Sequence, residues 1–180
     1  LAGNEAGVLA RARTAGVAGM LTIGTRLDQF ERVRAIAERH GNVWCSVGVH
    51  PHGAKEEGQR TPDRLVDAAR HPKVVGIGET GLDFYYEHSP RDEQTESFRA
   101  HIAAARQTGL PLIVHTRDAD RETIDILEEE RGKGAFPGLI HCFTSGPDVA
   151  RCALALGFYI SISGIVTFKA GATVLSVSNS

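Results

Sequence analysis

The sequence predicts an α/β fold in which helices cover a parallel sheet, and two observations predict it. Helix-like and strand-like segments alternate through nearly the whole chain, as they do in repeated β-α units. Each expected strand is short and apolar along its length, which is typical of strands with both faces buried under helices. A doubly wound sheet and a closed barrel both fit this alternation, so the choice between them depends on other residues.

Six helices are predicted by apolar residues at helical spacing and by signals at the helix ends. Asp28 precedes the second helix as a candidate N-cap. Thr61 is the candidate N-cap of the third helix, with Pro62 at its first position. Gly109 follows the fourth helix as a stop signal. The expected helices cover residues 4–15, 28–40, 61–70, 90–108, 119–131 and 147–156.

Six strands are predicted in the intervals that these helices leave. No low-complexity segment and no Pro/Ser-rich linker interrupts the alternation, so one domain over residues 1–180 is the simplest interpretation. The expected strands cover residues 17–23, 42–50, 74–78, 111–115, 138–141 and 158–163.

The composition is that of an ordinary globular protein. The 180 residues are 42% hydrophobic and 23% charged, with a formal net charge of −2. This balance gives no bulk electrostatic attraction to nucleic acid or to an anionic membrane, so any phosphate binding must be local. The three cysteines include no CxxC pair, which favours reduced thiols in a cytoplasmic protein. No apolar run is long enough to span a membrane.

Residues that can bind a metal or move a proton stand at the carboxyl ends of four expected strands: His50, Glu79, His115 and His141. In an α/β barrel these strand ends meet at one face, where active sites lie. A single histidine in such a place is usually structural, but three with a glutamate are harder to explain in that way. A buried glutamate needs a partner, which a divalent cation beside neutral imidazoles would supply. We therefore expect Glu79, His115 and His141 to lie within reach of one another.

Other polar residues follow the same strand ends, and several have two interpretations. Arg117 could bind a phosphate or carboxylate of a substrate, or it could pair with a neighbouring acid. Asp83 could be the partner of a metal-bound histidine or a base, or it could cap the turn after Gly81. His52 lies one step further into its loop and is expected to be solvated. Cys142 is expected to be a packed core thiol rather than a nucleophile.

Five long segments, taken together, resemble the TatD family of metal-dependent deoxyribonucleases. They extend over most of the chain, from about residue 16 to 169, in the family's order and spacing. The matching segments are SVGVHPH (46–52), VVGIGETGLDFYY (74–86), QTESFRAHIAAARQTGLPLIVHTRDA (94–119), GLIHCFTSG (138–146) and GFYISISGIVTFK (157–169).

The resemblance implies a TIM-type (β/α) barrel that hydrolyses DNA phosphodiesters with one or two divalent metal ions. Glu79 matches the metal-bridging ligand, which we also take as catalytic, and His115 and His141 match two further ligands. His50 matches a histidine of the family's substrate pocket, and Arg117 and Asp83 complete the expected substrate-binding set. The donor atoms suit Mg²⁺, Mn²⁺ or Zn²⁺ without choosing among them. DNA is the expected partner, and no membrane partner is expected.

The chain also departs from the family's pattern at both ends. The His-x-His pair of the first strand and the ETDSP-like segment near the last strand have no counterpart. The expected barrel is therefore incomplete, with about six of the eight βα units that close it. An open sheet of this kind exposes two edges, so poor solubility and weak activity are expected of the isolated chain.

Two other functions remain open on the sequence. A barrel metallohydrolase acting on amides, esters or nucleobases would share the ligand layout, because the fold does not fix the bond that is cut. A carboxylated lysine at a strand end would favour that class, and none is visible. An inactive fragment that binds metal without turnover is the second alternative.

Overall fold

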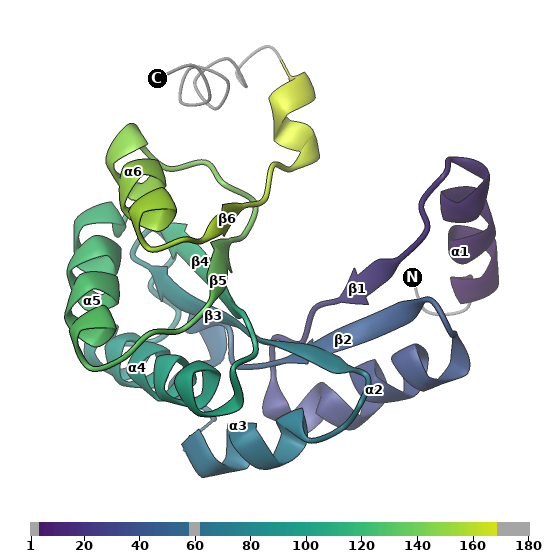
Figure 1. Ribbon diagram of the computed structural model, residues 1–180, viewed down its shortest axis with the longest axis horizontal. Helices are drawn as coiled ribbons and strands as arrows, with labels where there is room; N and C mark the ends of the chain where they lie inside the picture. Colours follow the sequence, from purple (N-terminus) through teal and green to yellow (C-terminus); the bar gives the residue numbers. More distant parts are fainter. Residues whose placement is uncertain (1–3, 58–61, 169–180) are drawn as a thin grey trace.

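The structure, a computed structural model, describes residues 4–57 and 62–168 as one parallel sheet of six strands. The strands lie in the order of the sequence, β1-β2-β3-β4-β5-β6, and each pairs in parallel with the next. The sheet curls instead of lying flat (Figure 1), so the incomplete barrel is confirmed and the doubly wound alternative is wrong. The strands are β1 (Met20–Thr22), β2 (Val43–Val47), β3 (Val74–Asp83), β4 (Leu112–Arg117), β5 (Gly138–Ile140) and β6 (Tyr159–Ile160).

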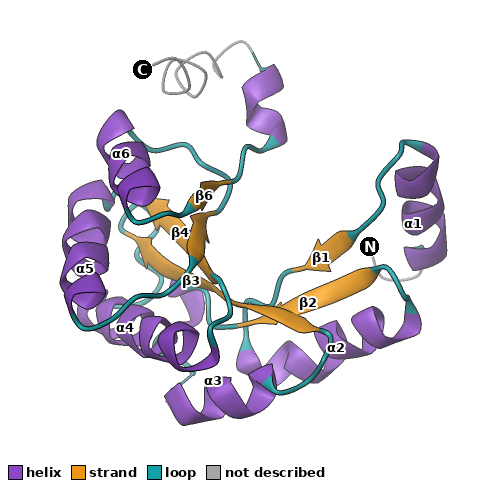
Figure 2. Ribbon diagram, in the orientation of Figure 1, coloured by secondary structure: helices purple, strands orange, loops and turns teal. Residues whose placement is uncertain are grey.

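Helices follow the strands in strict alternation, as the sequence predicts, and α2 to α6 line the outer side of the curled sheet (Figure 2). Each helix connects one strand to the next, because neighbouring parallel strands can be joined only by a crossover connection. Short 3-10 helices η1 (Leu27–Gln29), η2 (Pro51–Gly53) and η3 (Gly164–Thr167) lie in the loops. The α-helices are α1 (Glu5–Thr14), α2 (Phe30–Arg39), α3 (Pro62–Ala69), α4 (Arg91–Thr108), α5 (Asp120–Gly132) and α6 (Pro147–Ala155).

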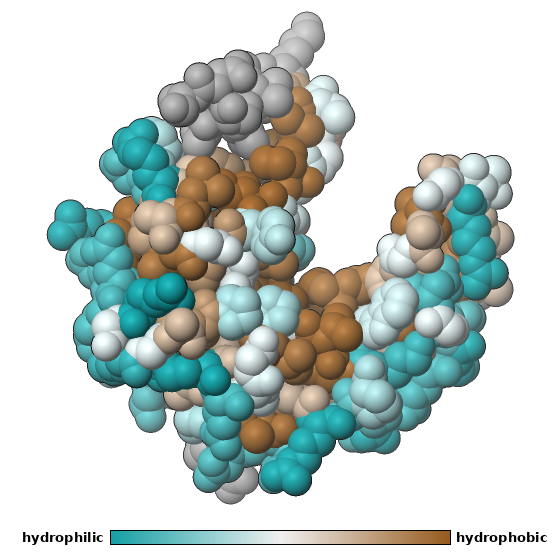
Figure 3. All heavy atoms as spheres, in the orientation of Figure 1, coloured by the Kyte–Doolittle hydropathy of each residue, from teal (hydrophilic) through white to brown (hydrophobic). Residues whose placement is uncertain are grey.

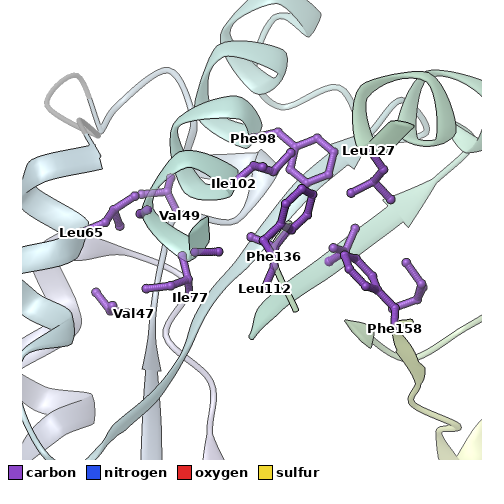
Figure 4. Close-up of a cluster of buried hydrophobic side chains, with 14 of the residues drawn as sticks. Val47, Val49, Leu65, Ile77, Phe98, Ile102, Leu112, Leu127, Phe136 and Phe158 are labelled. Atoms are coloured by element: carbon purple, nitrogen blue, oxygen red, sulfur yellow. The ribbon is translucent and has the colours of Figure 1, made fainter. Parts of the chain in front are cut away.

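The hydrophobic core lies between the sheet and this outer layer of helices (Figure 4). Phe98 and Ile102 on α4 are fully buried, and so are Ile77 on β3 and Leu112 on β4. Each such side chain contributes roughly 1.5–3 kcal/mol when it leaves water. This packing fixes α4 against β3, the strand that carries Glu79.

A buried ion cluster joins α4 to α5. Glu130 is 4% exposed, and its carboxylate accepts hydrogen bonds from Arg99 Nη1 at 2.7 Å, Arg106 Nη2 at 3.0 Å and Lys133 Nζ at 2.7 Å. Burial alone would raise the pKa of Glu130, but these three hydrogen bonds outweigh it and lower the pKa. None of the predicted site residues at the strand ends belongs to this ion cluster.

Several expected boundaries differ from the structure. Asp28 is not the N-cap of α2, because it lies inside η1 and its carboxylate binds the Arg26 guanidinium at 2.8 and 2.9 Å. The third strand runs on from residue 78 to Asp83, because its second half pairs with β4. The last strand is shorter than predicted and covers Tyr159–Ile160. The predicted cap Thr61 lies outside the described residues.

The sheet is open in the described part of the chain, with β1 and β6 as its two edges. Figure 3 shows a hollow between the arm that carries α1 and the rest of the molecule, with apolar side chains around it. Leu21 on β1 is 40% exposed and Tyr159 on β6 is 79% exposed. Over residues 4–57 and 62–168, no helix has the length and apolar composition that crossing a membrane requires.

Candidate metal centre

Four elements bring the predicted ligand residues to one place at the carboxyl ends of the strands. Glu79 lies within β3 and His115 within β4, while His141 follows β5 and His50 follows β2. His141 Nδ1 is 2.7 Å from Glu79 Oε1, and His115 Nδ1 is 3.6 Å from the same oxygen. Donor atoms of His50, Glu79 and His115 all lie within 4.8 Å of one another. The convergence expected from the strand ends is therefore present, and His50 joins it.

The backbone holds Glu79 rigidly in this position. Its N–H donates to Gly24 O at 2.7 Å, which ties β3 to the loop after β1. Two residues further on, Gly81 is paired with His115 across the β3–β4 ladder. Glu79 is only 8% exposed, so its carboxylate depends on the imidazoles around it for charge compensation.

A buried histidine on α4 orients the loop that carries His50. His101 Nε2 accepts a hydrogen bond from Val49 N at 2.9 Å, and its Nδ1 donates to Ser97 O at 2.7 Å. The N–H of His50 donates to Thr25 O at 2.9 Å. The His50 ring then lies 4.5 Å from the His115 ring, measured between centroids.

Burial and hydrogen bonding shift the pKa values of the cluster's side chains in different directions. Burial would raise the pKa of Glu79, but its contacts with His115 and His141 outweigh burial and hold the pKa well below the usual range. The hydrogen bond to Glu79 raises the pKa of His141. Burial, assisted by the nearby His115, lowers the pKa of His50 to about 4. The cluster thus combines an ionised carboxylate with an imidazole that is neutral at pH 7, as a divalent cation requires.

Asp83 combines both of the roles that the sequence left open. Its Oδ1 accepts hydrogen bonds from Tyr85 N at 3.2 Å and Tyr86 N at 2.9 Å, which caps the turn after β3. Its Oδ2 lies 3.1 Å from His115 Nε2 and 2.9 Å from His52 Nε2. His52 is therefore only partly solvated, because Asp83 holds its ring and the side chain is 35% exposed.

The contact with Asp83 decides which nitrogen of His115 faces the cluster. When Nε2–H donates to the Asp83 carboxylate, Nδ1 carries a lone pair that points toward Glu79 Oε1, 3.6 Å away. The Nδ1 lone pair and the negatively charged Glu79 oxygen repel each other, and a cation bound between them would remove this repulsion. This arrangement, a carboxylate that fixes the tautomer of a ligating histidine, is the usual support of a protein metal site.

Replacing Asp83 by asparagine is expected to weaken divalent cation binding roughly 10- to 100-fold. The Tyr85 and Tyr86 N–H groups hold the amide oxygen, so an NH2 group replaces the acceptor that faces His115. Titration calorimetry with Mn²⁺ measures this affinity. Asp148→Asn is the matched control, since Asp148 is an exposed residue of α6 that pairs with Arg151. Equal Mn²⁺ affinity in wild type and Asp83→Asn would show that Asp83 has no influence on the site.

The lowered pKa of His50 predicts how the stability of the metal-free protein depends on pH. Between pH 4 and 6.5 the unfolded chain binds a proton on His50 that the folded chain does not, so the free energy of unfolding rises with pH in this window. His50→Gln is expected to remove about 1–2 kcal/mol of that rise. Urea titrations with EDTA at several pH values measure it, and an unchanged slope in the variant contradicts the assignment.

A cavity of about 700 Å³ opens beside the cluster and contains the predicted phosphate contact, Arg117. The alternative in which Arg117 pairs with an acid is wrong, because it forms no ion pair in the described part of the chain. Its guanidinium instead lies 4.1 Å from the centroid of the Tyr85 ring.

Cys142, which lines the same cavity, also differs from its prediction. It is exposed rather than packed, because β5 ends at Ile140 and the chain turns at Cys142 with φ +48°. The cavity is lined by residues 115–118, 120, 141, 142, 144–146 and 165.

Sequence reasoning missed one feature beside the cluster, the exposed aromatic pair Tyr85 and Tyr86. They are 57% and 49% exposed, although only Phe84 separates them from the end of a buried strand. Two adjacent tyrosines after the polar end of a strand, in LDFYY, are the signal that could have indicated them.

The fold and the cluster define this chain as an α/β-barrel protein with a candidate metal centre at the carboxyl ends of its strands. It belongs to the family described as TatD related DNase, whose model matches residues 1–179.

Relatives and solved structures agree with this family. The chain is 37% identical over 162 residues to "Uncharacterized metal-dependent hydrolase YabD" of Bacillus subtilis, covering 90% of this chain and 63% of that protein. It is 40% identical over 160 residues to "3'-5' ssDNA/RNA exonuclease TatD" of Enterobacter lignolyticus, covering 88% and 61%. The crystal structure of YJJV, a TatD homologue from Escherichia coli, superposes with a TM-score of 0.87 at 25% identity, covering 97% of this chain and 68% of that one. The chain thus spans less than two thirds of the length of the first two relatives.

Proposed function

We propose that this protein is a metal-dependent hydrolase that cuts phosphodiester bonds of single-stranded nucleic acid, with DNA as a substrate. The observation that carries the proposal is the convergence of the Glu79 carboxylate with the imidazoles of His50, His115 and His141 at one end of the sheet. Relatives named as 3'-5' ssDNA/RNA exonucleases support the substrate class and the exonuclease mode.

We assign the metal ligands as Glu79, His115 and His141, with His50 close enough to serve as a ligand or as a contact to the substrate. Glu79 has two oxygens and can bridge two cations. Bound divalent cations would lower the pKa of a coordinated water and stabilise negative charge on the phosphoryl oxygens. Asp83 orients His115 for this purpose, and Arg117 offers a positive charge to a substrate phosphate in the neighbouring cavity.

The structure weakens the case for an amide, ester or nucleobase hydrolase of the carboxylated-lysine type. In the described residues, no hydrogen bond or ion pair joins a lysine to Glu79, His115 or His141. Lys73 precedes β3, at the opposite end of the sheet, and its Nζ donates to the backbone oxygens of His40, Gly41 and Val43. A phosphodiester substrate also gives Arg117 a function that a neutral amide does not.

A substrate panel tests the proposed function. Single-stranded DNA and RNA labelled at either end are incubated with Mg²⁺, Mn²⁺ or Zn²⁺, beside amide and lactone substrates. The proposal predicts stepwise shortening of DNA that EDTA stops. Turnover of lactones or amides alone would replace the proposal with the rival class, and turnover of nothing at saturating metal would favour an inactive, metal-binding chain.

We further propose that residues 1–180 belong to a single partial barrel domain and that the protein acts in the cytoplasm. The three cysteines support this location, because all of them are free thiols and reducing compartments maintain that state.

A further inference from the structure

The loop after β3 exposes aromatic side chains that the proposed chemistry does not use. Tyr85 and Tyr86 are 57% and 49% exposed, although large aromatic rings gain most when they are buried. Their rings are perpendicular, with centroids 4.7 Å apart. The ring of His88 is parallel to that of Tyr86, with a centroid distance of 5.6 Å. Exposed aromatic groups beside a candidate site indicate a ligand surface.

A cation completes this group. The Arg117 guanidinium carbon lies 4.1 Å from the Tyr85 centroid and 4.8 Å from the Tyr86 centroid. Such contacts lie within the range of cation–π attraction. We call Tyr85, Tyr86, His88 and Arg117 the aromatic platform. Arg117 covers one face of the Tyr85 ring, and Tyr85 as a whole is 57% exposed.

The aromatic platform is connected to the metal centre through Asp83. One oxygen of Asp83 accepts the N–H groups of Tyr85 and Tyr86, and the other contacts His115 Nε2. Arg117 lies opposite Asp83 in the backbone register of the β3–β4 ladder. The backbone oxygen of Arg117 accepts a hydrogen bond from Phe84 N at 2.9 Å. Arg117 also lines the cavity that contains His115 and His141. Through Arg117, the platform therefore adjoins the cavity beside the metal centre.

We propose that the aromatic platform stacks a base of single-stranded nucleic acid while a neighbouring phosphate occupies the metal centre. This inference rests on the proposed function and specifies how its substrate is held. Single-strand binding proteins combine aromatic faces for the bases with cations for the backbone, and the platform places both within 5 Å of each other. Stacking on a ring face is tolerant of base identity, so the platform predicts little sequence preference.

The contribution of the bases to binding tests this proposal. A fluorescein-labelled thymidine oligomer and an abasic oligomer of the same length carry the same phosphates, but only the first can stack. Fluorescence anisotropy, with Ca²⁺ in place of a metal that supports turnover, gives the affinity for each. Wild type is expected to prefer the thymidine oligomer roughly 5- to 100-fold.

Three variants separate stacking from other effects. Tyr85→Ala is expected to lose most of the preference for bases while binding the abasic oligomer as wild type does. Tyr85→Phe keeps the ring and is expected to keep the preference. Tyr159→Ala removes a still more exposed tyrosine on strand β6 and is expected to change nothing. Thermal unfolding of each variant confirms that it folds.

The outcomes distinguish this inference from the proposed function. If the wild type shortens DNA but does not discriminate thymidine from abasic oligomers, the platform proposal is wrong and the hydrolase proposal stands. If Tyr85→Ala lowers both affinities equally, or neither, the ring does not stack bases. If the wild type neither binds nor cuts any oligomer, both proposals are overturned.

Discussion

Glu79→Gln is expected to reduce strongly the metal-dependent hydrolysis that we propose. The substitution keeps the shape of the side chain but replaces the carboxylate that contacts both His115 and His141 by a neutral amide, which is a poor ligand for a divalent cation. Mn²⁺ affinity is expected to fall roughly 100-fold or more. The specificity constant kcat/KM on single-stranded DNA is expected to fall roughly 1,000-fold. Calorimetry and gel-based cleavage measure the two quantities.

Glu130→Gln is the matched control for this experiment. Glu130 is also a buried glutamate held by positively charged partners, but it lies between α4 and α5. Its replacement is expected to lower the free energy of unfolding and leave Mn²⁺ affinity unchanged. If Glu79→Gln binds Mn²⁺ as tightly as wild type does, Glu79 is not a ligand.

Gly81→Ala is expected to destabilise the fold more than any single removal of a surface contact. Gly81 has φ +132°, and a Cβ at this position would lie 2.0 Å from His115 O on the neighbouring strand. Backbone strain and overpacking together would cost about 3–5 kcal/mol. The strand that moves to relieve the overlap carries His115, so Mn²⁺ affinity is expected to fall as well.

Urea denaturation measures this effect, with Gly132→Ala as the control. Gly132 ends α5, and in the described residues no atom beyond its chain neighbours and its own helix backbone lies within 4 Å of a Cβ added there. Alanine is therefore expected to be neutral or slightly stabilising. Equal free energies of unfolding for Gly81→Ala and wild type would show that β3 and β4 are less tightly packed than described.

The sequence predicted the order of elements well because hydrophobic periodicity is a local property. All six strands and six helices appear where the alternation places them. The second half of β3 was missed, because Glu79, Thr80 and Gly81 break the apolar pattern. That half is held by non-local pairing with β4, in which Thr80 faces Val114 and Asp83 faces Arg117. Pairing between distant segments is not visible in a local pattern.

The sequence indicated which residues form the candidate site but not which of their side chains contact one another. Strand ends indicated that Glu79, His115 and His141 would meet, and the distances agree. Nothing in the spacing of His52 and Asp83 shows that their side chains bond to each other. The exposure of Cys142 follows from a turn with positive φ, which the expected alternation along a strand could not reveal.

Crystals containing Mn²⁺, examined by anomalous diffraction, test most directly whether these residues share a cation. The expected result is an anomalous peak about 2.0–2.4 Å from a carboxylate oxygen of Glu79 and from an imidazole nitrogen of His115 or His141. Manganese bound only elsewhere, or no peak near Glu79 at saturating Mn²⁺, would contradict the metal centre and the hydrolase that depends on it.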